Sequence, residues 1–204
     1  IPFEMSLCRD SLIHWISQWC WTYDPRRKPA WLPINPWPKQ REFVTWLGER
    51  DKTETGGLVE KSRDSGVSVF CCADAVHCWR FSEGSIGFGS RKELYVDNPG
   101  DPDSIFEKLR IIISRLPAWQ LPKGYDPAKH STFGKIINPE NGNTITGEAG
   151  DQIGRGGRKR KYYLDEAAYV ERPKEVDKAL AANTDIRIDV STPNGLGNPF
   201  YVKR

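Results

Sequence analysis

Hydrophobic positions near the start of the chain recur at helical spacing. Apolar side chains across residues 4–22 predict one amphipathic helix. Residues 24–38 are rich in proline, which fixes φ and removes a backbone donor, so this connector is expected to lack regular structure. A second helix is predicted from about Pro38 to Arg50, with apolar side chains on one face.

From Gly57 onward the pattern changes to short apolar strands that alternate with helices. The predicted strands are Gly57–Lys61, Ile86–Gly89, Phe133–Asn138, Thr144–Gly147, Lys161–Asp165 and Ile186–Ser191. The predicted helices are Val67–Phe81, Asp103–Leu116 and Lys174–Ala182. This alternation predicts an α/β fold with a mostly parallel central sheet flanked by helices, and such sheets bind ligands at the carboxyl ends of their strands.

The length of 204 residues favours one domain with extensions. We expect a helical and proline-rich N-terminal extension over residues 1–35 and an α/β domain over residues 36–204. A hydrophobic fraction of 38% with 28% charged residues excludes a disordered chain. No apolar run approaches the ~18 residues that span a bilayer, and no charged segment precedes an apolar one at the start, so we expect neither a membrane nor a secretory function.

Charge and cysteine content narrow the picture only slightly. Thirty basic against 27 acidic residues leave a net charge of +3, which by itself does not indicate a nucleic-acid-binding protein. The five cysteines are odd in number and show no C-x-x-C spacing. We therefore expect reduced, packing thiols in a cytosolic protein, with neither disulfides nor a zinc site.

The segment Leu58–Ser68 has the order strand, polar loop, glycine, hydroxyl and helix. A phosphate-binding loop needs inward N–H groups at a helix N-terminus, a cation and a metal-binding hydroxyl. The pattern G-x-x-x-x-G-K-[ST] fails twice, since Lys61 takes the first glycine position and Val67 the lysine position. Lys61 or Arg63 could still reach the phosphates, and Ser68 keeps the metal position. An ordinary strand-to-helix turn is the alternative.

Two adjacent carboxylates, Asp165 and Glu166, follow the predicted strand Lys161–Asp165. Asp165 is suited to hold Mg²⁺, and Glu166 to orient and deprotonate an attacking water. Adjacent acids also occur at strand ends without a function. Because parallel strands end at the same sheet edge, however, Ser68 and Asp165 are expected to lie near one another.

Two further segments fit the same chemistry more weakly. The strand Ile186–Ser191 ends in small hydroxyl residues, which suit a sensor of the γ-phosphate or a simple turn. The amide of Gln40 offers both a donor and an acceptor and so matches the adenine edge.

The glycine-rich run Gly154–Lys161 carries five basic residues from Arg155 onward and is expected to be mobile. An arginine there could neutralise transition-state charge, an effect of roughly 10³ to 10⁵ in rate, or the run could bind DNA phosphates. A solvated loop without a function is the remaining alternative.

Taken in this order, the segments resemble the ATPase domain of phage large terminase subunits, the motors that package DNA into procapsids. The resemblance covers about Trp37 to Tyr201, and its most specific parts are Lys61–Ser68, Tyr163–Ala167 and Ser191–Tyr201. Terminases have a deviant Walker A motif with the basic residue upstream of the glycine, so both departures noted above agree with the family.

The resemblance implies a P-loop NTPase fold of the ASCE type that binds ATP and Mg²⁺. The nucleotide-binding residues would be Gln40, Lys61, Ser62, Arg63, Asp64, Ser65, Gly66, Val67 and Ser68. Ser68 and Asp165 would bind the metal, and Glu166 would be the catalytic carboxylate.

The coupling motif would be Ser191, Thr192 and Pro193. In similar proteins an arginine shortly before Walker B acts on the ATP of a neighbouring subunit. Arg155 fits this role by its spacing, and Arg158 remains open.

The implied function is Mg-ATP hydrolysis that drives double-stranded DNA into a procapsid. The implied partners are DNA, a portal protein, the small terminase subunit and further copies in a ring, all in the host cytoplasm. Large terminases also carry an RNase H-like nuclease domain, which nothing after Tyr201 supplies, so we expect a truncated form or a gene remnant without DNA cleavage. A superfamily 2 helicase-like translocase is the alternative, although Val67 argues against it; a prophage remnant that only binds nucleotide is another.

Overall fold

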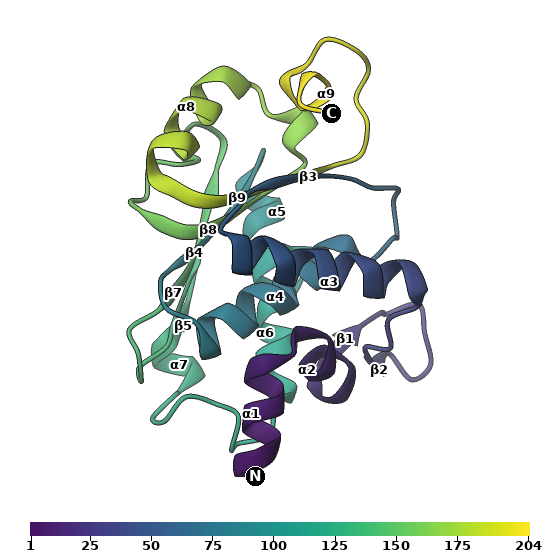
Figure 1. Ribbon diagram of the computed structural model, residues 1–204, viewed down its shortest axis with the longest axis vertical. Helices are drawn as coiled ribbons and strands as arrows, with labels where there is room; N and C mark the ends of the chain where they lie inside the picture. The colour runs from purple at the N-terminus through teal and green to yellow at the C-terminus, as the bar shows by residue number, and fades with distance from the viewer.

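A seven-stranded sheet forms the centre of the computed structural model, which describes residues 1–204 (Figure 1). Its strand order is β3-β9-β8-β4-β7-β6-β5. The strands are β3 (Gly57–Glu60), β4 (Ile86–Ser90), β5 (Ser131–Thr132), β6 (Lys135–Ile137), β7 (Thr144–Ala149), β8 (Lys159–Asp165) and β9 (Thr184–Ser191). In this order, all neighbouring strands from β3 to β7 are parallel. The pairs β7–β6 and β6–β5 are antiparallel. The predicted α/β fold with a mostly parallel sheet is confirmed.

Helices cover both faces of this sheet (Figure 1). On one face lie α3 (Pro38–Thr53), α4 (Val67–Phe81) and α6 (Ile105–Arg115), and on the other lies α8 (Pro173–Asn183). The remaining short elements are α5 (Glu93–Val96), α7 (Pro127–His130), α9 (Pro199–Val202), η1 (Gly150–Gln152) and η2 (Ala167–Tyr169). Every residue of α4 from Phe70 to Trp79 is buried, because the sheet, α3 and α6 surround this helix. None of the helices is long and apolar enough to cross a membrane.

The N-terminal helix differs from its prediction. Residues 4–22 do not form one helix but two, α1 (Pro2–Asp10) and α2 (Leu12–Trp19), followed by the strand β1 (Trp21–Tyr23). Ser11 separates the helices in an extended conformation, and its hydroxyl accepts a hydrogen bond from the His14 N–H at 3.2 Å. Serine is a preferred N-cap, so this local bond outweighs the continuous helical pattern.

The proline-rich connector also contains regular structure that was not predicted. The strand β2 (Trp31–Pro33) pairs antiparallel with β1 and forms a two-stranded ribbon. Pro33 is the last residue of β2, where proline is tolerated because a two-stranded ribbon has only edge strands. The expectation that residues 24–38 lack regular structure is therefore wrong at β2.

The N-terminal segment shares one hydrophobic core with the sheet and its helices. Cys8, Trp15 and Ile16 are fully buried in the same cluster as the apolar residues of α4 and α6. The indole N–H of Trp15 donates to Oε1 of Gln120 at 2.8 Å. All five cysteines are free and buried, as predicted.

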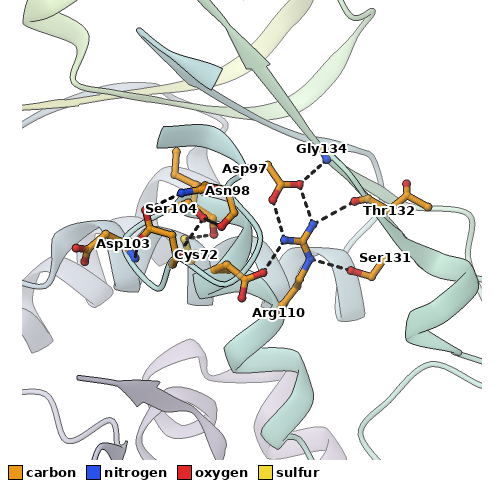
Figure 2. Close-up of polar contacts among 12 residues, drawn as sticks. Cys72, Asp97, Asn98, Asp103, Ser104, Arg110, Ser131, Thr132 and Gly134 are labelled. Atoms are coloured by element: carbon orange, nitrogen blue, oxygen red, sulfur yellow. Dashed lines mark hydrogen bonds and ion pairs between the residues drawn. The ribbon is translucent and has the colours of Figure 1, made fainter. Parts of the chain in front are cut away.

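The antiparallel hairpin β5–β6 is fixed by a buried carboxylate (Figure 2). Arg110 of α6 donates to both oxygens of Asp97, at 2.8 and 2.7 Å. Asp97 also accepts from the Gly134 N–H, and the guanidinium of Arg110 reaches Ser131 and the Thr132 carbonyl. These bonds join the hairpin to α6. The hairpin therefore covers the edge of the parallel sheet next to β7.

A buried ion pair joins α4 to β8. Lys161 of β8 is completely buried and contacts the carboxylate of Asp74 on α4, which also accepts from the Tyr163 hydroxyl. Lys161 lies 3.5 Å from Asp51 of α3, which Arg160 contacts at 2.6 Å. Burial alone would lower the pKa of Lys161, but Asp74 and the other negative groups around it, among them Asp51, together outweigh burial and raise this pKa well above its usual range.

The substitution Lys161→Ala is expected to destabilise the protein strongly, because it leaves the carboxylate of Asp74 buried without its cation. Breaking such a pair costs about 3–5 kcal/mol of unfolding free energy, which urea denaturation measures. Lys129→Ala is the matched control, since Lys129 forms an exposed pair with Asp126 and its loss should cost less than about 0.5 kcal/mol. Similar small losses for both variants would contradict a structural role for Lys161.

Candidate functional site

Polar side chains gather where four neighbouring parallel strands end. Lys61 follows β3, Ser191 ends β9, Asp165 ends β8, and Arg91 follows β4. Because these strands run in the same direction, their carboxyl ends form a single edge of the sheet. This edge holds most of the residues that the sequence singled out.

The loop between β3 and α4 turns through two left-handed residues. Asp64 has φ of 57° and Gly66 has φ of 79°, and the Gly66 carbonyl accepts from the Val69 N–H at 3.0 Å. The Ser65 hydroxyl donates to the Ser62 carbonyl at 2.9 Å. The N-cap of α4 is glycine, so no side chain competes for the N–H groups of the first turn, and an anion can bind there.

The expected proximity of Ser68 and Asp165 is confirmed. The Ser68 hydroxyl donates to Oδ2 of Asp165 at 3.0 Å, and the Lys61 ammonium lies 3.9 Å from Oδ1 of the same carboxylate. A hydroxyl and a carboxylate oxygen are the hard ligands that Mg²⁺ prefers. The donor set at this point therefore fits a magnesium ion with its phosphate ligands.

Glu166 directly follows Asp165 in the left-handed conformation, with φ of 54°. Its N–H donates to Oδ1 of Asp165 at 3.0 Å, and its Oε2 lies 2.7 Å from Nε of Arg91. The guanidinium of Arg91 also packs over the rings of Tyr95 and Tyr169. Sequence reasoning did not identify Arg91; the available signal was a basic residue directly after a predicted central strand.

Gln40 reaches the loop from the first turn of α3. Its Nε2 donates to the Ser65 carbonyl at 3.1 Å, and its Oε1 accepts from the Trp37 N–H at 3.2 Å. A side-chain amide thus connects the start of α3 to the loop. The N-terminal ribbon also touches this loop, since Arg26 lies 3.5 Å from the carboxylate of Asp64.

The residues that end β9 contact the turn after Glu166. The Ser191 hydroxyl accepts from the Ala168 N–H at 3.2 Å. The Tyr169 hydroxyl donates to the Pro193 carbonyl at 3.2 Å, and it also bonds to the hydroxyl of Thr192. A displacement of the end of β9 would therefore move the turn that follows Glu166.

The basic run before β8 is only partly a loop. The strand begins at Lys159, two residues before its predicted start at Lys161, so the expected loop is wrong for Lys159, which is buried, and for Arg160, which pairs with Asp51. Arg155 and Arg158 are exposed, and their side chains form no hydrogen bond or ion pair. Arg63 in the loop after β3 is likewise exposed and unpaired.

Solved structures with the same fold include phage large terminases. The HK97 bacteriophage large terminase matches with a TM-score of 0.62 at 14% identity, over 90% of this chain and 37% of its own. The large terminase of a thermophilic bacteriophage in complex with ADP matches with a TM-score of 0.57 at 17% identity, over 82% and 41%. A mutant ATPase domain of the Thermus phage P74-26 large terminase matches with a TM-score of 0.51 at 20% identity, over 83% and 74%.

These matches confirm the fold that the resemblance predicted. It is the P-loop NTPase fold of large terminase ATPase domains. No family model matches the sequence, and no curated protein does. The chain spans less than half the length of the HK97 enzyme and of the ADP-bound terminase.

Gly66 is expected to be essential for the loop geometry. An alanine at this φ costs about 1–2 kcal/mol of stability, and its Cβ would lie 3.0 Å from Nε2 of Gln40. Gly66→Ala should therefore lower the urea midpoint. Gly48→Ala is the control: it lies inside α3 with nothing within 4 Å, so alanine should add about 0.5–1 kcal/mol. Equal effects of the two substitutions would contradict the strained turn.

Proposed function

We propose that this chain is the ATPase motor domain of a phage terminase large subunit, which hydrolyses Mg-ATP to drive double-stranded DNA into a procapsid. The observation that carries the proposal is the contact between Ser68 and Asp165, with Lys61 and Glu166 beside it, at the carboxyl edge of the sheet. The shared fold with large terminases supports it, and one of those structures holds ADP.

In this proposal the phosphates lie at the N-terminus of α4, within the loop Lys61–Ser68. Lys61 is the better candidate for the cation, because it already lies beside Asp165, whereas Arg63 is exposed and unpaired. Gln40 would contact the adenine from beside the loop, where its bond to Ser65 holds the side-chain amide. The remaining loop residues Ser62, Asp64, Ser65, Gly66 and Val67 contribute backbone groups.

Ser68 and Asp165 would hold Mg²⁺, which would supply positive charge to the β- and γ-phosphate oxygens. Glu166 would accept the proton of the attacking water, which must lie in line with the leaving oxygen. In this structure Glu166 pairs with Arg91, so proton acceptance requires its carboxylate to turn from Arg91 to the water.

Two further groups complete the proposed motor. Ser191, Thr192 and Pro193 would couple the site to movement, since they bond to the turn after Glu166. Arg155 would neutralise transition-state charge at the site of a neighbouring copy; its exposed and unpaired side chain supports this role, and Arg158 shares that exposure.

The proposed partners are double-stranded DNA, the portal protein, the small terminase subunit and further copies in a ring, in the cytoplasm of the host. The chain spans 37% of the HK97 terminase, and the function proposed for it is that of the motor part. A superfamily 2 helicase-like translocase would carry lysine where Val67 stands. A form that binds ATP without hydrolysing it is the alternative that the first experiment below separates.

A thermal melt with and without Mg-ATP tests the site. Ligand at ~100 times its Kd adds ~2.7 kcal/mol, which raises the Tm of wild type by several degrees. Ser68→Ala should reduce this rise because it removes a metal ligand, whereas Glu166→Gln should keep the rise and abolish hydrolysis. Hydrolysis that is undetectable in wild type and unchanged in Glu166→Gln would refute the motor and leave the non-hydrolysing form.

Lys61→Ala is expected to weaken ATP binding at least about tenfold, which corresponds to ~1.4 kcal/mol, because a charge-assisted contact to phosphate is lost. Calorimetric titration with Mg-ATP measures this change. Arg63→Ala serves as the matched control and should change the affinity less than about twofold. The opposite pattern would transfer the cation role to Arg63.

A further inference from the structure

The loop of residues 150–158 leaves β7 and crosses the face of the sheet that α8 covers. Ile153 is buried with Tyr162, Leu164 and Leu180 in a cluster on that face. The residues of β8 that alternate with these, Lys161 and Tyr163, face α4 on the opposite side. The loop that carries Arg155 and Arg158 is therefore separated from α4 by the sheet.

One carboxylate holds this loop in place. Oε2 of Glu148, on β7, accepts from the Gly154 N–H at 2.6 Å and from the Tyr162 hydroxyl at 2.9 Å. Its Oε1 accepts from the Gly156 N–H at 3.1 Å. Hydrogen bonds to an ionised acceptor are about twice as strong as neutral ones, so three donors on one carboxylate form a firm anchor.

The neighbouring strand is built to admit this contact. Tyr162 reaches Glu148 across β4, and a Cβ added at Gly87 would lie 2.3 Å from the Tyr162 ring. A Cβ at Gly89 would lie 2.6 Å from its hydroxyl, and one at Gly156 would lie 2.2 Å from Oε1 of Glu148. Glycine thus stands at each point where Glu148 or Tyr162 needs space.

Arg155 lies between the two anchored amides. The carbonyl of Gly154 accepts from Nδ2 of Asn183 at 2.8 Å, and the carbonyl of Gly156 accepts from the Lys159 ammonium at 3.1 Å. In Gly154 and in Gly156, which flank Arg155, both the backbone N–H and the backbone carbonyl are therefore hydrogen-bonded. The side chain of Arg155, in contrast, is exposed and forms no hydrogen bond or ion pair.

We propose that Glu148 is the positioning residue of the arginine loop, which holds the backbone around Arg155 so that its guanidinium points outward to the nucleotide of a neighbouring copy. The proposal rests on the proposed function, in which Arg155 acts in trans. Fixing the loop in advance removes the ordering that would otherwise oppose the contact with the neighbour. Glu148 would act through Arg155 and is not itself a catalytic residue.

Limited trypsin digestion tests the anchor without reference to activity. Glu148→Ala and Gly156→Ala, which displaces the carboxylate, should each speed cleavage after Arg155 at least about tenfold, because an unanchored loop opens more often. Cleavage after Arg63, in the distant loop, should not change, and this excludes general unfolding. Asp151→Asn is the matched control, since this exposed acid pairs only with Arg172 and its loss should leave both cleavage rates as in wild type.

ATP hydrolysis tests the consequence. Both anchor variants should lower kcat at least about tenfold, as Arg155→Ala should, and leave the KM for ATP within about twofold. Mixing Glu148→Ala with Glu166→Gln chains should then restore turnover above the sum of the two. At mixed contacts where the Glu166→Gln chain supplies the arginine, its intact Arg155 loop meets the intact Glu166 of a Glu148→Ala chain.

The outcomes separate this proposal from the proposed function. Unchanged cleavage and unchanged kcat in both anchor variants, with Arg155→Ala still impaired, would overturn the role of Glu148 alone. A mixture that gives only the summed activity would also overturn it, as would a wild-type turnover per chain that stays constant with chain concentration. In both of these cases ATP hydrolysis would stand, whereas a wild type without hydrolysis would refute the motor itself.

Discussion

The buried ion pair between Lys161 and Asp74 is the constraint on which the rest of the structure depends. Lys161 and Asp165 lie on the same face of β8, because side chains alternate along a strand. Asp74 and Ser68 both belong to α4. A fixed contact at one end of this helix–strand pair thus sets the register at the other end, where Ser68 meets Asp165. A buried charge is costly unless it is paired with an opposite charge. Other alignments of α4 along β8 would separate Lys161 from Asp74, so they are excluded more strictly than by apolar packing alone.

The two faces of β8 divide the molecule into two chemical regions. Lys161, Tyr163 and Asp165 face α4 and the phosphate loop, whereas Tyr162 and Leu164 face α8 and the arginine loop. Movement of this one strand would therefore reach both regions at once. The turn after Glu166 adds a third connection, since Ser191 of β9 bonds to it directly.

The sequence predicted what depends on local periodicity and on strand direction. The bounds of α4 agree with their prediction, and the proximity of Ser68 to Asp165 followed from the parallel sheet. The expected roles of these residues are a separate question that the proposed experiments address. The prediction of a single N-terminal helix was wrong because Ser11, a serine N-cap, interrupts a helical pattern of apolar residues that continues on both sides of it.

Other features could not be read locally, because they depend on partners far along the chain. Lys161 belonged to a basic run, and nothing near it reveals the carboxylate of Asp74. The contacts of Arg91 with Glu166 and of Glu148 with Tyr162 likewise form only because β4, β7 and β8 lie side by side.

The buried cysteines have a practical consequence for spectroscopy. Burial raises the pKa of Cys72 and Cys78 to about 12, and burial together with the nearby Glu4 does the same for Cys8. The thiolate is the reactive form, so these side chains resist alkylation at neutral pH. A cysteine introduced at an exposed position would be the one thiol open to a maleimide dye. Distances between labelled copies could then be followed by energy transfer in the otherwise native chain.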